Sequence, residues 1–362
     1  MNTVRVFVVD DSALMRKMIP QILSRDPAIE VVGTAMDGIF ALKKIPELKP
    51  DVITLDVDMP RMDGLETLRH IVGDFGIPTI MVSSLTRRNA DLTFRALNLG
   101  AFDFVAKPKD AISVHIAEIG EELVAKVRAA AVSVGARLRA VKYQPPAAPA
   151  VKKEGALPRI RTEKILAIGI STGGPNVLSY LLPRLPRDFP AAILIVQHMP
   201  VGFTEMFANR LNAGCAIDIK EARDGDLVIP GRALIAPGNR HLKIKRLPLG
   251  TIAVLSDAPA VSGHRPSADV LFRAVAAEYG RSVVGLIMTG MGADGAAGIG
   301  DIKAEGGLTL AQDEASCVVF GMPKVAIEMN HIAKVLPLEA MAAYLCEHFR
   351  TQEVECVERG VQ

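Results

Sequence analysis

The chain has 362 residues, 49% of them hydrophobic, and a formal net charge of +2 at pH 7. This length allows two domains, and the many Gly, Ala, Val and Ile residues suit α/β domains with buried parallel strands. A nearly balanced charge provides no attraction to nucleic acid or to a membrane surface, so we expect neither as a partner.

The four cysteines lack metal-ligand spacing and are typical of reduced thiols in a cytosolic protein: Cys215, Cys317, Cys346 and Cys356. The N-terminal residues enter an apolar strand at once, without the architecture of a signal peptide. No apolar run reaches the roughly 18–20 residues that a membrane span needs. We therefore expect a cytoplasmic protein that does not insert into a membrane.

The first part of the chain alternates apolar runs with segments of helical spacing, which predicts five βα units. The strands are expected at 4–9, 30–35, 51–55, 78–82 and 103–105, and helices at 14–24, 38–48, 90–99 and 113–131. This alternation predicts a doubly wound, flavodoxin-like parallel sheet.

Residues suited to phosphate chemistry follow four of these strands: Asp10, Asp11, Asp56, Ser83 and Lys107. Ligands of an open parallel sheet bind outside the carboxyl ends of its strands. Three carboxylates at one edge repel each other and favour a hard divalent cation such as Mg²⁺. One carboxylate can also attack phosphorus, and a hydroxyl and an ammonium group can bind the resulting phosphoryl group. A single aspartate at a strand end is more often a helix cap, but five such residues are hard to assign to caps.

Residues 3–125 closely resemble the response-regulator receiver domain. The resemblance is carried by Asp10-Asp11, Asp56, Asp58-Met59-Pro60, Asp63-Gly64, Ser83 and Lys107-Pro108. It implies that Asp56 is the phosphoacceptor, that Asp10, Asp11 and Asp56 bind Mg²⁺ together with the Asp58 carbonyl, and that Ser83 and Lys107 sense the phosphoryl group. In such domains the Lys107–Pro108 peptide bond is often cis.

A change in composition separates this region from the rest of the chain. Residues 142–160 are rich in proline, alanine and lysine and have no apolar period, which is typical of an extended linker. We expect a receiver domain at 1–125, a linker at 126–162, a second α/β domain at 163–350 and a tail at 351–362. The charge of this tail predicts disorder.

The clearest chemistry lies in residues 165–175, ILAIGISTGGP. A buried strand at 165–170 leads to Ser171, and Gly173, Gly174 and Pro175 lead into a helix. Small residues let the backbone turn sharply and expose the serine, and the first N–H groups of the helix can stabilise an oxyanion. A glycine-rich turn that binds phosphate or caps a helix fits this stretch equally well.

Two further predicted strands bring an imidazole and a carboxylate to the same edge. The strands at 191–197 and 282–288 lead to His198 and to a glycine-rich loop that contains Asp294. With Ser171 these residues would provide the hydroxyl, the general base and the orienting carboxylate of a hydrolytic triad. The N–H groups of 290–292 are candidates for an oxyanion hole.

The residues alone leave alternatives to this triad. His264 is the main competitor as the base, and Asp257 and Asp269 could replace Asp294, which on its own is better explained as a helix cap. His241 begins a predicted hairpin strand. The remaining histidines have no assigned role: His70, His115, His331 and His348.

Residues 163–350 resemble the catalytic domain of the chemotaxis protein-glutamate methylesterases. The resemblance is carried by 168–175, Gln197-His198-Met199-Pro200, Phe203-Thr204, Ala236-Pro237-Gly238, His264-Arg265-Pro266-Ser267, 289–292 and Asp294-Gly295. It implies Ser171 as nucleophile, His198 as base, Asp294 as the residue that orients it, and the Met291 N–H as an oxyanion donor, with no cofactor for the esterase reaction. The order Ser…His…Asp differs from that of α/β-hydrolases. Ala293 stands where many relatives carry a polar residue.

The two resemblances together imply a phosphorylation-controlled serine esterase of chemotactic adaptation. It would hydrolyse glutamate γ-methyl esters on chemoreceptors, release methanol and deamidate receptor glutamines, with a chemotaxis histidine kinase as phosphodonor. The unphosphorylated receiver would cover the Ser171 edge.

The alternative is a response regulator whose second domain binds DNA or a methyl ester without catalysis. The near-neutral charge, the lack of a strongly basic recognition helix and the length of the second domain disfavour DNA. A test for hydrolysis of a methyl ester would distinguish the enzyme hypothesis from that of a non-catalytic binding module.

Overall fold

The structure is a computed structural model in which the chain divides into two compact units, residues 1–140 and 141–362. It describes residues 3–84, 86–107, 114–132 and 162–359. Residues 142–160 of the predicted linker at 126–162 lie outside the described residues, as does the peptide bond to Pro108. Among those described, no helix combines the length and the apolar character that crossing a membrane requires.

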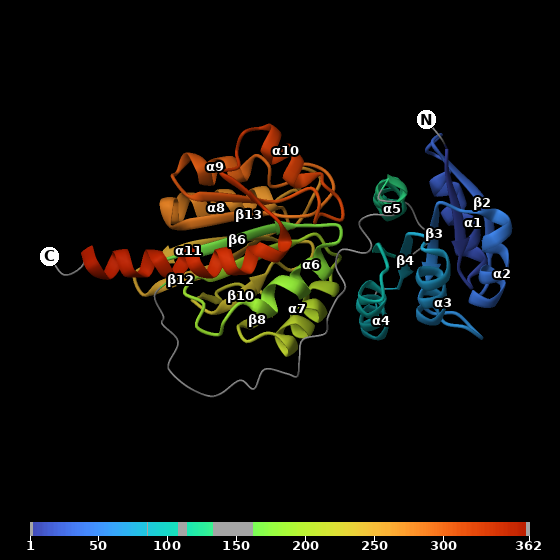
Figure 1. Cartoon of the computed structure of the whole chain (residues 1–362), viewed down its shortest axis with the longest axis horizontal. Helices are drawn as coiled ribbons and strands as arrows, with labels where there is room; N and C mark the ends of the chain where they lie inside the picture. The colour runs from blue at the N-terminus through green and yellow to red at the C-terminus, as the bar shows by residue number, and fades with distance from the viewer. Residues whose placement is uncertain (1–2, 85, 108–113, 133–161, 360–362) are drawn as a thin grey trace. The chain divides into compact units, whose positions relative to one another are not determined.

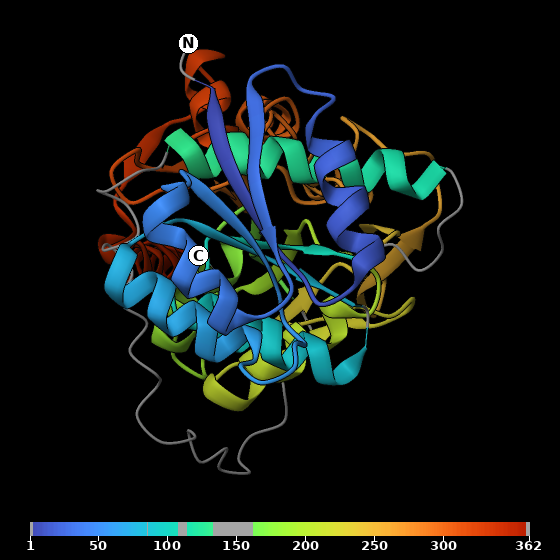
Figure 2. The same cartoon turned by 90° about the vertical axis from the view of Figure 1, so that its right-hand side faces the viewer.

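The described part of the first unit contains a five-stranded parallel sheet in the order β2-β1-β3-β4-β5. Its strands are β1 (Val4–Val9), β2 (Ile29–Ala35), β3 (Val52–Asp56), β4 (Thr79–Ser83) and β5 (Asp103–Ala106). Its helices are α1 (Ala13–Leu23), α2 (Gly38–Leu48), α3 (Gly64–His70), which continues into a π-helical turn (Ile71–Phe75), α4 (Arg87–Asn98) and α5 (Val114–Val132). Figure 2 shows α1 and α5 on one face of the sheet and α2, α3 and α4 on the other.

Burial and capping explain these elements. The inner strands read as continuous apolar runs because helices cover both of their faces, and every residue of β3, β4 and β5 is buried. Side chains at the N-caps begin four helices: Ser12, Asp37, Asp63 and Thr86 each accept an N–H group three residues further on. The predicted α/β fold of this region is confirmed.

The second unit is built on a seven-stranded parallel sheet in the order β15-β14-β13-β6-β7-β10-β8, with a separate antiparallel sheet β11-β12-β9. The strands of the large sheet are β6 (Ile165–Ile170), β7 (Ala192–Gln197), β8 (Asp218–Glu221), β10 (Arg232–Ile235), β13 (Val283–Ile287), β14 (Leu308–Gln312) and β15 (Lys334–Leu336). The small sheet has β9 (Leu227–Val228), β11 (His241–Leu247) and β12 (Gly250–Ser256). The sequence analysis did not anticipate β9 and β15, which are too short to show a period.

Helices cover both faces of the large sheet, as the doubly wound class requires. They are α6 (Gly174–Leu181), α7 (Phe203–Gly214), α8 (Ala268–Tyr279), α9 (Gly298–Ala304), α10 (Met322–Glu328) and α11 (Leu338–Arg359), with short 3₁₀ turns at Leu182–Arg184 and Gly280–Ser282. Figure 1 shows α8, α9 and α10 on one face and α6, α7 and α11 on the other.

The end of the chain differs from the expectation. The charged residues after Arg350 were expected to form a disordered tail, but α11 continues as far as Arg359. Because the helix is already established over Leu338–Arg350, each further residue adds a hydrogen bond without a new nucleation cost. The prediction of disorder directly after Arg350 is therefore wrong.

Helix α11 is anchored by one aromatic residue. Phe349 is fully buried, and its ring meets that of Phe189 edge to face with centroids 5.2 Å apart. Its carbonyl also accepts a hydrogen bond of 2.9 Å from the buried Lys164 ammonium group. This contact joins the last helix to the residue directly before β6.

We expect Phe349→Ala to lower the free energy of unfolding of the second unit by about 3–4 kcal/mol, because it leaves a cavity at a site that cannot collapse. Leu249, which is 90% exposed, provides a control. Urea unfolding of the two variants should show a large change for Phe349→Ala and almost none for Leu249→Ala. Equal changes would contradict this role for Phe349.

Candidate catalytic and phosphoacceptor sites

Three neighbouring strands of the second unit bring Ser171, His198 and the Asp294 loop to one edge. β13, β6 and β7 lie side by side and parallel, so their carboxyl ends coincide. Ser171 follows β6, His198 follows β7, and the His198 N–H donates to the Ile170 carbonyl at 3.2 Å. The shared edge expected from the sequence is present.

The Ser171 turn is held by backbone bonds on both sides. Its N–H donates to the Thr289 carbonyl at 3.0 Å, and its carbonyl accepts from the Gly174 N–H at 2.8 Å. Gly173, with φ of 76°, adopts the left-handed conformation that a side chain disfavours. These bonds fix the serine at the start of α6.

The loop after β13 approaches the serine closely. A Cβ atom on Gly290 would lie 2.8 Å from the Cβ of Ser171 and 2.3 Å from the Met322 sulfur, so only glycine fits. The Gly290 N–H already donates to the Val319 carbonyl. The next N–H group, that of Met291, has no hydrogen-bond partner among the described residues. It lies in the same loop, which passes close to Ser171.

The side chains of His198 and Asp294 are joined by a hydrogen bond. Nε2 of His198 lies 2.8 Å from Oδ2 of Asp294, whose side chain is fully buried, whereas Nδ1 is buried and has no hydrogen-bond partner among the described residues. A carboxylate can only accept, so Nε2 carries the proton and Nδ1 presents a lone pair. The imidazole is thus in the tautomer of a general base.

The Asp294 carboxylate is kept ionised by its donors. Burial alone would raise its pKa, but hydrogen bonds from His198, from the Ser267 hydroxyl at 2.6 Å and from the Ala268 N–H at 2.7 Å hold the pKa below the usual value. The Asp269 N–H donates as well, at 3.2 Å. The donors from Ser267, Ala268 and Asp269 belong to the N-terminus of α8, a favourable place for a negative charge.

The residues considered as alternatives to His198 and Asp294 have other contacts. Asp257 forms an ion pair with Arg240, and the carboxylate of Asp269 accepts from the Ser262 hydroxyl and the Gly298 N–H. The ring of His264 stacks on that of His198, with centroids 3.9 Å apart and planes 10° from parallel. Asp294 is thus the carboxylate bonded to His198, and His264 lies against the imidazole.

The sequence analysis did not assign roles to several buried polar residues of this edge. The Gln197 amide donates to the carbonyls of both Ser171 and His198, at 3.0 and 3.2 Å. Thr289 donates to the Thr172 carbonyl at 3.0 Å and accepts from the N–H groups of Val318 and Val319. A polar residue at the end of an apolar strand is the signal that marks both positions.

In the first unit, Lys107 bridges two aspartates at the carboxyl edge of the sheet. Its ammonium group lies 2.9 Å from Oδ2 of Asp10 and 2.7 Å from Oδ2 of Asp56. Asp10 follows β1 and Asp56 ends β3, the strands between which the strand order reverses. The structure therefore brings together Asp10, Asp56 and Lys107 as the sequence predicted.

The charges of this cluster are unbalanced. The pKa of Asp56 is raised to about 6, and burial is the main cause. The ammonium group of Lys107 opposes this increase, and the charge of Asp10 adds to it. Burial also raises the pKa of Asp10. Although burial opposes it, the two carboxylates raise the pKa of Lys107. One ammonium group does not offset two buried carboxylates.

The oxygen atoms of this cluster fit a magnesium ion. Ligand atoms of Asp10, Asp11 and Asp56 lie within 4.8 Å of one another, and all are hard carboxylate oxygens. A divalent cation would stabilise the ionised carboxylates against burial, the main cause of the two raised pKa values, and against their mutual repulsion. Asp58 is exposed, and its N–H donates to Oδ1 of Asp56 at 3.3 Å.

Ser83 is buried at the end of β4, and among the described residues no hydrogen bond joins its hydroxyl to the aspartates. Its hydroxyl has two long contacts, with the carbonyls of Ser84 at 3.4 Å and Asn89 at 3.5 Å. Neither is a strong bond, so the hydroxyl can turn toward another acceptor at little cost. The structure places Ser83 at the end of β4, the strand that pairs with the β3 strand of Asp56.

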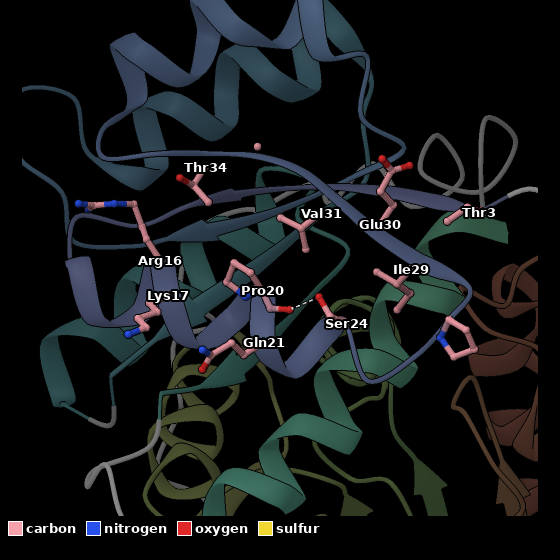
Figure 3. A pocket seen from close by; sticks show the side chains of 12 residues that line it. Thr3, Arg16, Lys17, Pro20, Gln21, Ser24, Ile29, Glu30, Val31 and Thr34 are labelled. Carbon is pink, nitrogen blue, oxygen red and sulfur yellow. Dashed lines mark hydrogen bonds between the residues drawn. The ribbon is translucent and has the colours of Figure 1, made fainter.

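A broad, shallow cavity of about 940 Å³ lies between α1 and β2 (Figure 3). Pro20 of α1, its C-cap residue Ser24, and Val31 and Thr34 of β2 line it, and the Ser24 hydroxyl donates to the Pro20 carbonyl. Its lining includes none of the aspartates of the Lys107 cluster. The cavity is therefore distinct from both candidate sites.

Comparison with known proteins shows the class of each unit. The family model described as CheB methylesterase matches residues 166–345, and the response regulator receiver domain model matches residues 6–118. A crystal structure of the Thermotoga maritima CheB methylesterase catalytic domain is 41% identical, covering 51% of this chain and 98% of that chain with a TM-score of 0.51.

Curated relatives match both units together. The protein-glutamate methylesterase/protein-glutamine glutaminase 2 of Koribacter versatilis is 56% identical over 97% of this chain and 98% of its own length. The protein-glutamate methylesterase/protein-glutamine glutaminase of Escherichia coli K12 is 47% identical over 94% and 96%. The chain belongs to this family of CheB methylesterases with a response regulator receiver domain.

Because burial raises the Asp56 pKa from 3.8 to about 6, the folded first unit is destabilised wherever this carboxylate is ionised. We expect Asp56→Asn, without Mg²⁺, to raise the free energy of unfolding at pH 7.5 by up to about 2–3 kcal/mol. The gain should shrink as the pH falls through 6 and disappear near pH 4, because the wild-type carboxyl is then protonated as well.

Urea unfolding of the first unit across this pH range measures the effect. Asp74→Asn is the matched control, because Asp74 is exposed on the same unit. A gain for Asp56→Asn that stays the same at pH 7.5 and pH 4 would contradict the burial argument.

Proposed function

We propose that the chain is a phosphorylation-regulated serine esterase that hydrolyses glutamate γ-methyl esters on methylated chemoreceptors and releases methanol. By the same acyl transfer it would deamidate receptor glutamines. The observation that carries the proposal is the hydrogen bond from Nε2 of His198 to Asp294, which leaves the buried Nδ1 atom without a partner among the described residues, next to the strand that leads to Ser171. Relatives that match nearly the whole chain bear the names of these two activities.

In this mechanism the Ser171 hydroxyl attacks the ester carbonyl while Nδ1 of His198 takes its proton. The negative oxygen of the tetrahedral intermediate faces the loop after β13, where the Met291 N–H would donate to it. Nδ1 then returns the proton to the leaving methoxide, and methanol departs. Water attacks the acyl-enzyme by the same route and releases the glutamate, and Asp294 stays ionised throughout.

Asp56 is the proposed phosphoacceptor, with a chemotaxis histidine kinase as the donor. Asp10, Asp11, Asp56 and the Asp58 carbonyl would hold Mg²⁺, whose charge screens the carboxylates from one another and from the phosphoryl oxygens. Lys107 would exchange its bond to Asp56 for one to the phosphoryl group. Ser83, whose hydroxyl has only long contacts, would turn to the same group.

The proposed division places the receiver at 1–125, the linker at 126–162, the esterase domain at 163–350 and the tail at 351–362. In this proposal the unphosphorylated receiver covers the Ser171 edge, and phosphorylation loosens that contact. The receptor helices that carry the esters are cytoplasmic, so the proposal places the chain in the cytoplasm.

We expect Ser171→Ala to reduce methanol release from methylated receptor membranes by at least about 10⁴-fold, because the nucleophile is lost. Phosphorylation of Asp56 should be unaffected. Ser256→Ala, a serine on β12, is the control and should retain full activity. Undiminished release by Ser171→Ala would overturn the assignment, and the lack of release by the wild type would favour a non-catalytic ester-binding module.

Asp56→Asn should keep the basal esterase activity but lose its activation by a small phosphodonor with Mg²⁺. The amide cannot form the acyl phosphate, so the receiver stays in its unphosphorylated state. Methanol release with and without the phosphodonor measures this. Activation of the variant equal to that of the wild type would refute Asp56 as the phosphoacceptor.

A further inference from the structure

A buried hydroxyl contacts the carboxylate behind His198. Ser267 is fully buried, and its Oγ donates to Oδ1 of Asp294 at 2.6 Å. The other oxygen, Oδ2, faces Nε2 of His198 and the Ala268 N–H. The two oxygens of Asp294 therefore have separate partners, and the carboxylate cannot rotate without losing both.

A second buried histidine fixes Ser267. Nδ1 of His241 accepts from the Ser267 N–H at 3.2 Å, and Nε2 lies 3.0 Å from the Pro259 carbonyl. A carbonyl only accepts, so Nε2 carries the proton and Nδ1 has the lone pair that the Ser267 N–H requires. The fully buried His241 thus has one tautomer, and it holds the backbone of Ser267 in place.

Capping of α8 does not account for this geometry. Ser267 is the N-cap of α8, and its Oγ accepts from the Val270 N–H, but over 3.5 Å. The bond to Asp294 is shorter by almost 1 Å and has a charged acceptor, which makes it the stronger of the two. Because the hydroxyl accepts in one bond and donates in the other, both can form together.

We propose that Ser267 is a positioning residue of the esterase. Its hydroxyl keeps Oδ2 of Asp294 directed at His198 and withdraws part of the negative charge from the carboxylate. This inference rests on the proposed function, because it assigns Ser267 a role through the proposed base. Ser267 acts on Asp294 and not on the substrate.

The charge withdrawn by Ser267 affects the protonation of His198. Without the hydroxyl, more negative charge faces the imidazole, and the imidazolium is stabilised. The other titratable groups here are His264, stacked on His198, His241, held by the Ser267 N–H and the Pro259 carbonyl, and Asp269, whose carboxylate is held by Ser262 and Gly298. A Ser267 variant leaves these contacts in place, so the acid limb of the pH–rate profile should move to higher pH.

The test compares Ser267→Gly and Ser267→Ala in the full chain. Both remove the hydroxyl, but glycine is a good N-cap and alanine a poor one. Thr251→Val is the matched control: it removes a buried hydroxyl, bonded to Tyr279 at the other end of α8. The rate of methanol release is measured against receptor concentration and pH, and unfolding in urea is followed alongside.

We expect both Ser267 variants to lose about tenfold in kcat, with little change in KM and a shifted acid limb. Thr251→Val should lose stability and keep the wild-type profile. The inference is overturned if Ser267→Gly has the wild-type kcat and pH profile and only Ser267→Ala is impaired, as a capping role alone requires. An inactive wild-type chain would instead refute the proposed function.

Discussion

Parallel pairing of neighbouring strands is the constraint on which both candidate sites depend. All strands of a parallel sheet end at the same edge, so the residues that follow them meet even when they are far apart in the sequence. In the second unit this brings Ser171, His198 and the loop after β13 together. In the first unit it brings Asp10 and Asp56 to Lys107.

Each site contains a buried aspartate, and its pKa is shifted in opposite directions in the two sites. Burial raises the pKa of Asp56 to about 6, and the nearby charge of Asp10 opposes the compensation from Lys107. Asp294 is also buried, but the donors from His198, Ser267 and the α8 backbone lower its pKa. Ionisation of the first carboxylate is therefore unfavourable in the folded unit, whereas the second remains ionised and holds the His198 imidazole in place.

Much of the fold was predictable because its signals are local. Continuous apolar runs marked the strands that lead to Asp56, Ser171 and His198, and the hairpin strand predicted to begin at His241 is β11. The strands β9 and β15 and the full length of α11 were missed. The two strands are too short to have a period, and the last turns of the helix are charged residues that extend an existing helix.

By itself, the sequence determined the α/β class, the reactive residue types and their positions after strands, since these follow from composition and short-range periodicity. Only the tertiary structure decided which partners they have. In it, the carboxylate hydrogen-bonded to His198 is that of Asp294 rather than that of Asp257 or Asp269, and the Ser267 hydroxyl donates to Asp294. Ser267 and Asp294 are 27 residues apart in the sequence, and no local pattern encodes a contact that the packing of α8 against the sheet creates.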